Sequence, residues 1–361
     1  MAALIMGAGI FSLPYLFSRA GFWAGMVYLI VFCLIASIIH LMYSEVMKRT
    51  PGNHRFVGYA RIHLGRWAMG VSFLTTLVGI ILVLLIYLTL AVKFGKIIFP
   101  MVGDSYIFLA AWAIFSLSVI SGIERLAKLD LTITALKISI IVGIFAYGFT
   151  HFSSGNFPID SSALILPYSA VLFSLSGRSA ISSIHQYLKE NRVSEKYLNN
   201  ALVLGTVVPA VLYALFVIGV LGISGATVTP DAVSGITAVF PLAGAVVAVL
   251  GFLSLWTAYT FLGFEAQSIL ISDFKVPVLA AISAIAAIPL FLYFAGLNNF
   301  LWLIGVSGGV LLALESVLVI LMWQRVAKPR PMLMVVSGII IAIFVIAGVN
   351  ELFNLVSFSD I

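Results

Sequence analysis

The chain has 361 residues, of which 62% are hydrophobic and only 9% are charged. Soluble domains carry about 25% charged residues, so this composition excludes a soluble globular protein and indicates an all-α polytopic membrane protein. The formal net charge is +6, but the basic residues lie in short connections between apolar segments. They predict membrane orientation and contacts with anionic membrane lipids, and no nucleic-acid partner.

Apolar segments long enough to cross a membrane recur along the whole chain, and we predict eleven spans. In chain order they cover residues 1–17, 22–47, 67–99, 105–121, 129–149, 163–187, 197–223, 241–272, 276–296, 300–325 and 332–353. Between these spans, fourteen Lys and Arg residues fall on one side and three on the other. The positive-inside rule therefore places the N-terminus in the cytoplasm and the C-terminus, with Asp360, outside the cell membrane.

The first span contains a stretch that opposes helix formation. Gly7 and Gly9 lose much backbone entropy in a helix, and Pro14 lacks an N–H group. In lipid, unpaired backbone groups cost several kcal/mol each, roughly, so the interruption at residues 7–15 should face protein or a water-filled cavity. It is therefore a candidate binding site. Six helical residues before Gly7 reach about 9 Å, against about 15 Å for half the hydrocarbon core, so either the start of the chain is assigned too late or the chain is truncated.

A second interruption echoes the first. Residues 173–177 resemble residues 11–15 and lie 162 positions, or five predicted spans, later. An odd number of spans predicts inverted repeats, here residues 1–150 and 160–325, followed by an extra helix at 330–353. The half-helix near Gly177 would point N–H groups at a carboxylate, and freed carbonyls would hold a cation or an ammonium group. Close helix packing by Gly and Ser is the alternative.

Four short segments resemble the amino acid-polyamine-organocation superfamily, in particular its aromatic and neutral amino acid permeases, related to tyrosine permeases and the auxin/amino-acid permeases. They are Gly7-Ala8-Gly9-Ile10-Phe11-Ser12-Leu13-Pro14-Tyr15, Phe173-Ser174-Leu175-Ser176-Gly177-Arg178-Ser179-Ala180-Ile181, Ala135-Leu136-Lys137 and Gly305-Val306-Ser307-Gly308-Gly309. The resemblance implies a LeuT-type fold of two inverted five-helix repeats plus one extra transmembrane helix. It also implies import of an amino acid by alternating access.

The resemblance further implies which residues form the substrate site. Backbone groups of both interruptions would hold the substrate's carboxylate and amine, and Phe173 would act as a gate. The implied residues are Gly7, Ala8, Gly9, Ile10, Phe173, Ser174, Ser176 and Gly177. Arg178 departs from the resemblance, because the family more often has an uncharged residue at that place.

Lys137 lies about 10 Å inside the fifth span by helical rise, where a charge is costly unless it is paired or neutral. In superfamily members with this lysine, its ammonium resembles a stand-in for the sodium of the second cation site and contacts the interruption in span one. We therefore favour proton coupling or uncoupled exchange over sodium. The alternative is a lysine that snorkels to the surface. Thr257 and Thr260 are the side chains expected beside a sodium ion, unless they bond their own helix.

Further charged or titratable side chains lie within predicted spans. Arg178 follows the second interruption and needs a carboxylate, a carbonyl or water. It could bind a substrate carboxylate, but we favour an internal pair with Glu265 or Glu315, which would act as a gate or charge network. His40 falls near the cytoplasmic end of span two, where we predict a structural role.

An enzyme is not predicted, because the sequence has no His-Glu-x-x-His motif and Leu175-Ser176-Gly177 lacks the leading glycine of a membrane serine protease motif. No cofactor or metal ion is expected. The sequence favours a proton-linked or uncoupled permease for neutral amino acids, with aromatic ones among the candidates. The alternative is an amino acid sensor of the germinant-receptor type, built on the same fold and acting with a partner subunit.

Overall fold

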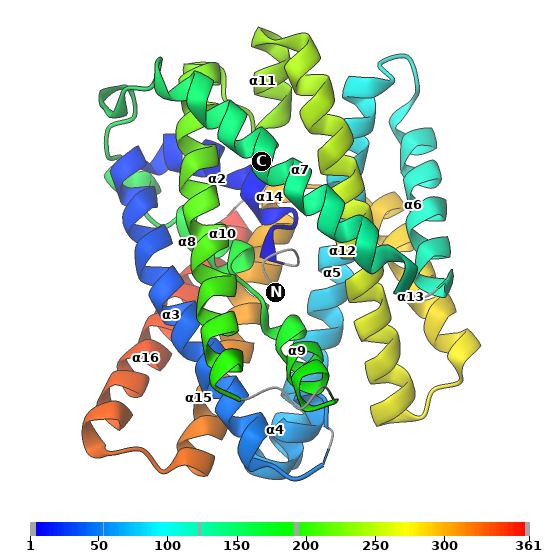
Figure 1. Ribbon diagram of the computed structural model, residues 1–361, viewed down its shortest axis with the longest axis vertical. Coiled ribbons are helices and arrows are strands. Elements are labelled where there is room, and N and C mark those ends of the chain that lie inside the picture. Colours follow the sequence, from blue (N-terminus) through cyan, green and yellow to red (C-terminus); the bar gives the residue numbers. More distant parts are fainter. Residues whose placement is uncertain (1–4, 53, 122–123, 191–194, 358–361) are drawn as a thin grey trace.

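The computed structural model of the chain describes residues 5–52, 54–121, 124–190 and 195–357, and within these ranges it contains helices and no strand (Figure 1). Asp360, which the sequence places outside the membrane, is not among the described residues. Several helices run the length of the bundle and enclose the broken segments near its centre (Figure 1). The segments that the sequence marks as irregular are therefore surrounded by regular helices.

Long apolar helices form most of the bundle. By length and composition, seven segments of the described residues can cross a membrane, and two apolar helices are shorter. The long ones are α3 (Phe22–Arg49), α5 (Arg66–Ile98), α7 (Glu124–Phe149), α10 (Glu195–Ser224), α12 (Pro241–Phe274), the segment Phe300–Ala327 and α16 (Pro331–Ser357); the shorter ones are α6 (Asp104–Ser121) and α13 (Val278–Phe294). Their bounds lie within a few residues of the predicted spans, and they make this a multi-pass membrane protein.

Two short helices in the connections were not predicted: α4 (Phe56–Leu64) and α11 (Val233–Val239). Helix α4 ends at Gly65, whose φ of 93° is open to glycine at little cost. In Figure 1, α4 and the α12–α13 and α15–α16 connections lie at the lower end of the bundle, whereas α11 lies at the upper end. The connections that carry most of the basic residues lie at this lower end. This is expected when the chain crosses a membrane in alternating directions and keeps its basic connections on one side.

The first membrane segment is broken before α2 (Gly9–Ala20). Residues 6–8, the first break, are not helical, and Gly7 N–H bonds to the Ile5 carbonyl at 2.7 Å. The interruption is shorter than predicted, because Pro14 lies inside α2. A proline there removes one helical hydrogen bond, to Ile10, and membrane helices tolerate such a loss when neighbouring groups compensate.

The sixth predicted span consists of two half-helices, α8 (Pro167–Ser174) and α9 (Arg178–Glu190). Residues 175–177 between them are the second break, which falls inside the predicted interruption. A third irregularity was missed: the segment Phe300–Ala327 consists of α14 (Phe300–Ile304), the π-helix η4 (Gly305–Leu312) and α15 (Ala313–Ala327). Such wide turns inside membrane helices are frequently functional.

Close packing brings the two breaks together. A methyl group on Gly9 would lie 2.3 Å from Ser174 Oγ, so α2 meets the end of α8 with no side chain between them. Similarly, a methyl group on Gly308 would lie 2.3 Å from the Ser169 carbonyl oxygen, so η4 packs directly on α8. These glycines let backbones approach as small residues do in other membrane helices. The fold therefore gathers all three irregular segments at one place.

Candidate functional site

A cavity of about 670 Å³, counting the space at its mouth, lies between the two breaks. The first break lines it with Gly7 and Ala8, and Gly9 follows at the start of α2. Phe173 and Ser176 line it from the second broken helix. The structure thus brings five of the eight predicted substrate residues to one cavity.

The cavity has a largely apolar wall and a charged end. Helices α5 and α12 and the π-helix η4 supply the wall through Gly79, Ile80, Val83, Tyr87, Leu262 and Leu311. The polar end is formed by Thr75, Thr76, Arg178 and Glu315. A ligand that fits this space combines an apolar body with a polar head that can use the backbone of the breaks.

The other three predicted substrate residues point elsewhere. Ile10 lines a separate cavity together with Lys137. Ser174 Oγ donates to the Ala170 carbonyl at 2.6 Å, and Gly177 N–H donates to His40 Nε2 at 3.3 Å. The second break therefore presents one edge to the cavity and the other edge to neighbouring helices.

Lys137 extends from α7 to the first break. Its Nζ donates to the Met6 carbonyl at 3.1 Å and to Ser254 Oγ of α12 at 2.9 Å. Both of these partners are neutral oxygen atoms. The ammonium group therefore connects the carbonyl freed by the first break to α12.

Thr257 and Thr260, the expected neighbours of a sodium ion, bond within their own helix. Thr257 Oγ1 donates to the Ser254 carbonyl at 3.1 Å, and Thr260 Oγ1 donates to the Trp256 carbonyl at 2.9 Å. The side chain of α12 that meets the lysine is Ser254, which the sequence reasoning missed. Serine spacing on α12 alone could not reveal it, because its partner comes from a helix 117 residues away in sequence.

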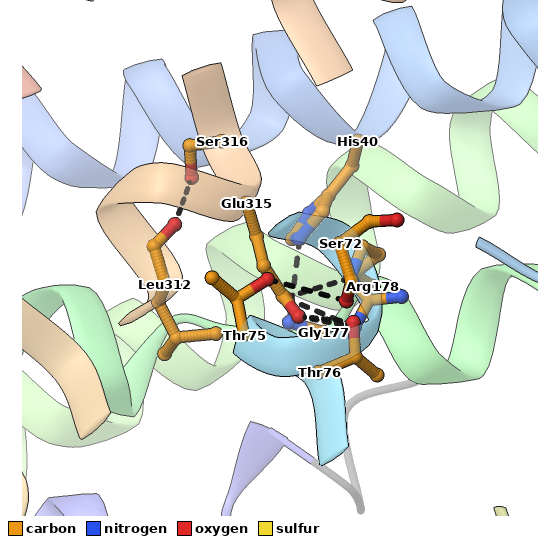
Figure 2. A network of polar contacts seen from close by, with 9 residues as sticks. All are labelled: His40, Ser72, Thr75, Thr76, Gly177, Arg178, Leu312, Glu315 and Ser316. Carbon is orange, nitrogen blue, oxygen red and sulfur yellow. Dashed lines mark hydrogen bonds and ion pairs between the residues drawn. The ribbon is translucent and has the colours of Figure 1, made fainter. Parts of the chain in front are cut away.

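Arg178 and Glu315 form a bidentate ion pair at the charged end of the cavity (Figure 2). Arg178 Nε donates to Glu315 Oε2 at 3.0 Å, and Nη2 donates to Oε1 at 3.1 Å. Thr76 adds a hydrogen bond to Oε1 at 2.6 Å, and the guanidinium lies over the Phe56 ring with 4.1 Å to its centroid. The side chains of Arg178 and Glu315 are 13% and 5% exposed. The pair thus joins α4, α5, α9 and α15.

Of the two predicted partners of Arg178, Glu315 is the one that the structure pairs with it. Glu265 lies on α12, and its Oε2 atom is buried without a hydrogen-bond partner among the described residues. A buried carboxylate that is not paired is costly, whereas the bidentate pair satisfies both of its charges.

His40, for which a structural role is predicted, lies inside the helix bundle. It is only 4% exposed and contacts the second break, where its Nε2 meets Gly177 N–H (Figure 2). Its other ring nitrogen, Nδ1, lies 2.9 Å from Thr206 Oγ1 of α10. The signal in the sequence was a lone histidine in an apolar span; its partner is 137 residues away and could not be read from the sequence.

No protein-family profile and no curated protein match this sequence. Among solved structures, the chain is similar to MhsT in complex with L-phenylalanine, with a TM-score of 0.70 and 17% identity over 98% of this chain and 97% of that one. It is also similar to Mhp1 in an inward-facing conformation, with a TM-score of 0.65 and 16% identity over 90% and 74%.

A third similar structure is Mhp1, a nucleobase-cation-symport-1 family transporter, closed with bromovinylhydantoin bound (TM-score 0.61, 15% identity, 99% and 90% coverage). The class of protein is thus defined by its fold: a multi-pass helical membrane protein with the LeuT-type architecture that the sequence predicts.

Proposed function

We propose that this chain is a permease, a secondary transporter that moves a neutral amino acid across the cell membrane by alternating access. The observation that carries this proposal is the contact between two broken helices that jointly line one cavity. In membrane proteins, irregular backbone at this depth is tolerated where it lines a cavity, and paired broken helices build midplane substrate sites. The fold shared with MhsT and Mhp1 supports the same conclusion.

The substrate class follows from the two ends of the cavity. The carboxylate and amine of an amino acid would be held by backbone at the breaks, through Gly7, Ala8, Gly9 and Ser176, with Phe173 as a gate. Its side chain would lie on the apolar wall formed by α5, α12 and η4, which favours neutral side chains up to aromatic size. The L-phenylalanine bound to MhsT is a ligand of this kind.

Coupling would occur at Lys137. Its ammonium already occupies the Met6 carbonyl, a hard oxygen ligand that a sodium ion would need. Lysine can lose its proton, unlike arginine, and the hydrogen-bond partners of Lys137 are neutral, so deprotonation leaves no unpaired carboxylate there. It would, however, weaken the hydrogen bonds that tie the first break to α12, because a neutral amine is a poorer donor than an ammonium group. We therefore favour proton symport or uncoupled exchange, with Thr257 and Thr260 outside the coupling site.

The Arg178–Glu315 pair would form the cytoplasmic gate. It lines the cavity, and its guanidinium contacts Phe56 of α4, the helix at the lower end of the bundle (Figure 1). Release of substrate on that side would require α9 to separate from α15 and α5, and Glu265 of α12 would offer the freed guanidinium an alternative carboxylate. In this proposal the inverted repeats are residues 1–150 and 160–325, residues 330–353 form the extra helix, and the N-terminus is cytoplasmic.

The proposal is tested by uptake of radiolabelled amino acids into sodium-free proteoliposomes, with and without an inward proton gradient. We expect neutral amino acids, phenylalanine among them, to accumulate or exchange, and any stimulation by protons to be lost in Lys137→Ala. Lys93→Ala, at an exposed position of α5, is the matched control. Binding of an amino acid without movement under any gradient would contradict the permease and favour the sensor that acts with a partner subunit.

A further inference from the structure

The second break has an edge that faces protein rather than the cavity. Helix α8 ends at Ser174 and α9 begins at Arg178, so the regular series of helical hydrogen bonds is interrupted between them. Ser176 and Arg178 line the cavity, whereas the Ser174 carbonyl and the Gly177 amide each meet a side chain from a long helix. The two side chains come from different helices, α3 and α10.

His40 of α3 meets the amide, and the hydrogen bonds around it assign its protonation. Gly177 N–H can only donate, so Nε2 of His40 is the acceptor at 3.3 Å. The Thr206 hydroxyl donates to the Leu202 carbonyl at 2.9 Å, so its oxygen is left to accept from Nδ1 of His40. His40 is therefore neutral, with its proton on Nδ1 and an acceptor aimed at the break.

Tyr213 of α10 meets the carbonyl. Its hydroxyl lies 3.0 Å from the Ser174 carbonyl oxygen and 2.6 Å from that of Ile5, and the side chain is fully buried. The Ile5 carbonyl also receives Gly7 N–H at 2.7 Å, so it has a second donor. One phenolic proton between two carbonyls links the first break to the second.

We propose that His40 and Tyr213 are paired positioning residues that hold the second break open. His40 accepts from Gly177 and Tyr213 donates to Ser174, so the protein-facing edge is satisfied without substrate, and the edge at Ser176 stays available to the substrate's head group. This inference rests on the proposed function. It also follows the predicted repeats, because α3 and α10 are the second spans of the first and second repeat.

The expected consequence concerns affinity more than speed. Without either side chain, the break has unpaired groups and closes or rearranges in part of the population. Substrate must then bind the fraction that remains open, which raises the apparent dissociation constant in inverse proportion to that fraction. Saturating substrate recovers the open form, so the maximal rate changes little.

The test is uptake kinetics of the full chain in proteoliposomes, with radiolabelled phenylalanine as the probe. We expect Tyr213→Phe, which keeps the ring and removes the hydroxyl, and His40→Leu to raise KM at least fivefold with maximal rates within twofold of native. His40→Gln, which keeps an acceptor oxygen, should restore KM to within twofold. The matched control is Tyr259→Phe, also fully buried but with its hydroxyl near Ser116 instead of a break.

The outcomes separate the two proposals. A native KM in Tyr213→Phe, or a lower maximal rate with unchanged KM, overturns the positioning role while transport by the native chain stands. If His40→Leu does not fold, Tyr213→Phe decides alone, because its shape is nearly native. Absence of both uptake and binding of amino acids in the native chain would instead overturn the proposed function.

Discussion

The two breaks differ in the charge of the groups that stabilise them. At the first break, residues 6–8, the freed groups are carbonyls, and their donors are the ammonium of Lys137 and the hydroxyl of Tyr213. At the second break, the freed amide of Gly177 has a neutral acceptor, His40, and the adjacent cation is Arg178, which Glu315 neutralises. A titratable cation therefore serves the first break, and a permanent, neutralised cation follows the second.

We propose that this difference gives separate tasks to the two halves of the site. A lysine whose hydrogen-bond partners are neutral can release a proton without leaving either partner charged, so proton chemistry would take place at the first break. An arginine cannot be deprotonated, and its bidentate pair opens only when helices move apart, so gating would take place at the second. The predictions below test this division, beginning with the largest expected effect.

Glu315→Ala should be the most damaging change, because it leaves the buried guanidinium of Arg178 without its carboxylate partner. Breaking a buried pair costs about 3–5 kcal/mol, which would appear as a large fall in the thermal midpoint in detergent and as loss of uptake. The double variant Arg178→Met with Glu315→Leu should regain most of the stability but not controlled transport. A single variant as stable as the native chain would show that the pair is not buried in solution.

Gly9→Ala should push apart α2 and α8, the two helices that border the breaks. Its new methyl group would lie 2.3 Å from Ser174 Oγ, so α2 or α8 must shift, and overpacking of this kind costs about 1–3 kcal/mol. We expect uptake to fall by more than tenfold. Gly143→Ala, whose methyl would meet nothing within 4 Å, is the control and should transport normally. Equal effects in the two variants would contradict the close contact.

Gly79→Ala should change substrate preference without disrupting the fold. The methyl would project toward the cavity wall, 3.8 Å from Leu311 Cδ1, where there is space for it. In competition assays of uptake, the variant should lose more of its inhibition by phenylalanine than of its inhibition by alanine, relative to the native chain. The reason is that one methylene in an apolar pocket is worth about 1–3 kcal/mol. Gly70→Ala on the same helix has no neighbour within 4 Å and serves as control. If the ratio of inhibition by phenylalanine to inhibition by alanine is unchanged, the substrate's side chain does not lie against this wall.

Thr76→Val should have the smallest effect. It removes the hydrogen bond to Glu315 Oε1 but leaves the bidentate arginine in place. A loss of about 1 kcal/mol is expected, visible as a modest fall in the thermal midpoint. Thr75→Val is the matched control, because Thr75 donates to the Ser72 carbonyl of its own helix. A larger fall in the thermal midpoint in Thr75→Val than in Thr76→Val would contradict the hydrogen bond between Thr76 and Glu315.

Hydropathy predicted the long helices because each must be apolar over about 20 residues, and this signal is local. The second break was also predicted in place, since Ser and Gly interrupt an apolar run there. The first break was predicted too long, because Pro14 was given the weight it has in a soluble helix; in the bundle, α2 continues through it.

What the sequence could not supply is the set of partners that stabilise the breaks. Tyr213 meets Ile5 across 208 residues, and His40 meets Gly177 across 137. Neither residue type is unusual in an apolar helix, and only the fold brings them to the breaks. The sequence likewise shows a Gly-rich motif at the place of the π-helix η4. Its wide turn, which packs on α8, could not be predicted from that motif. Lys137 and Arg178 can be identified from the sequence alone, because a charged residue inside a predicted span is unusual.

The most direct test of the central claim is proton movement evoked by substrate. Sodium-free proteoliposomes containing a luminal pH indicator would receive external phenylalanine, and the native chain would be compared with Lys137→Ala. Proton symport predicts acidification of the lumen by the native chain and none by the variant, with substrate binding retained in both. Acidification that persists without Lys137, or native uptake that occurs only when sodium is added, would contradict the assignment of coupling to the first break.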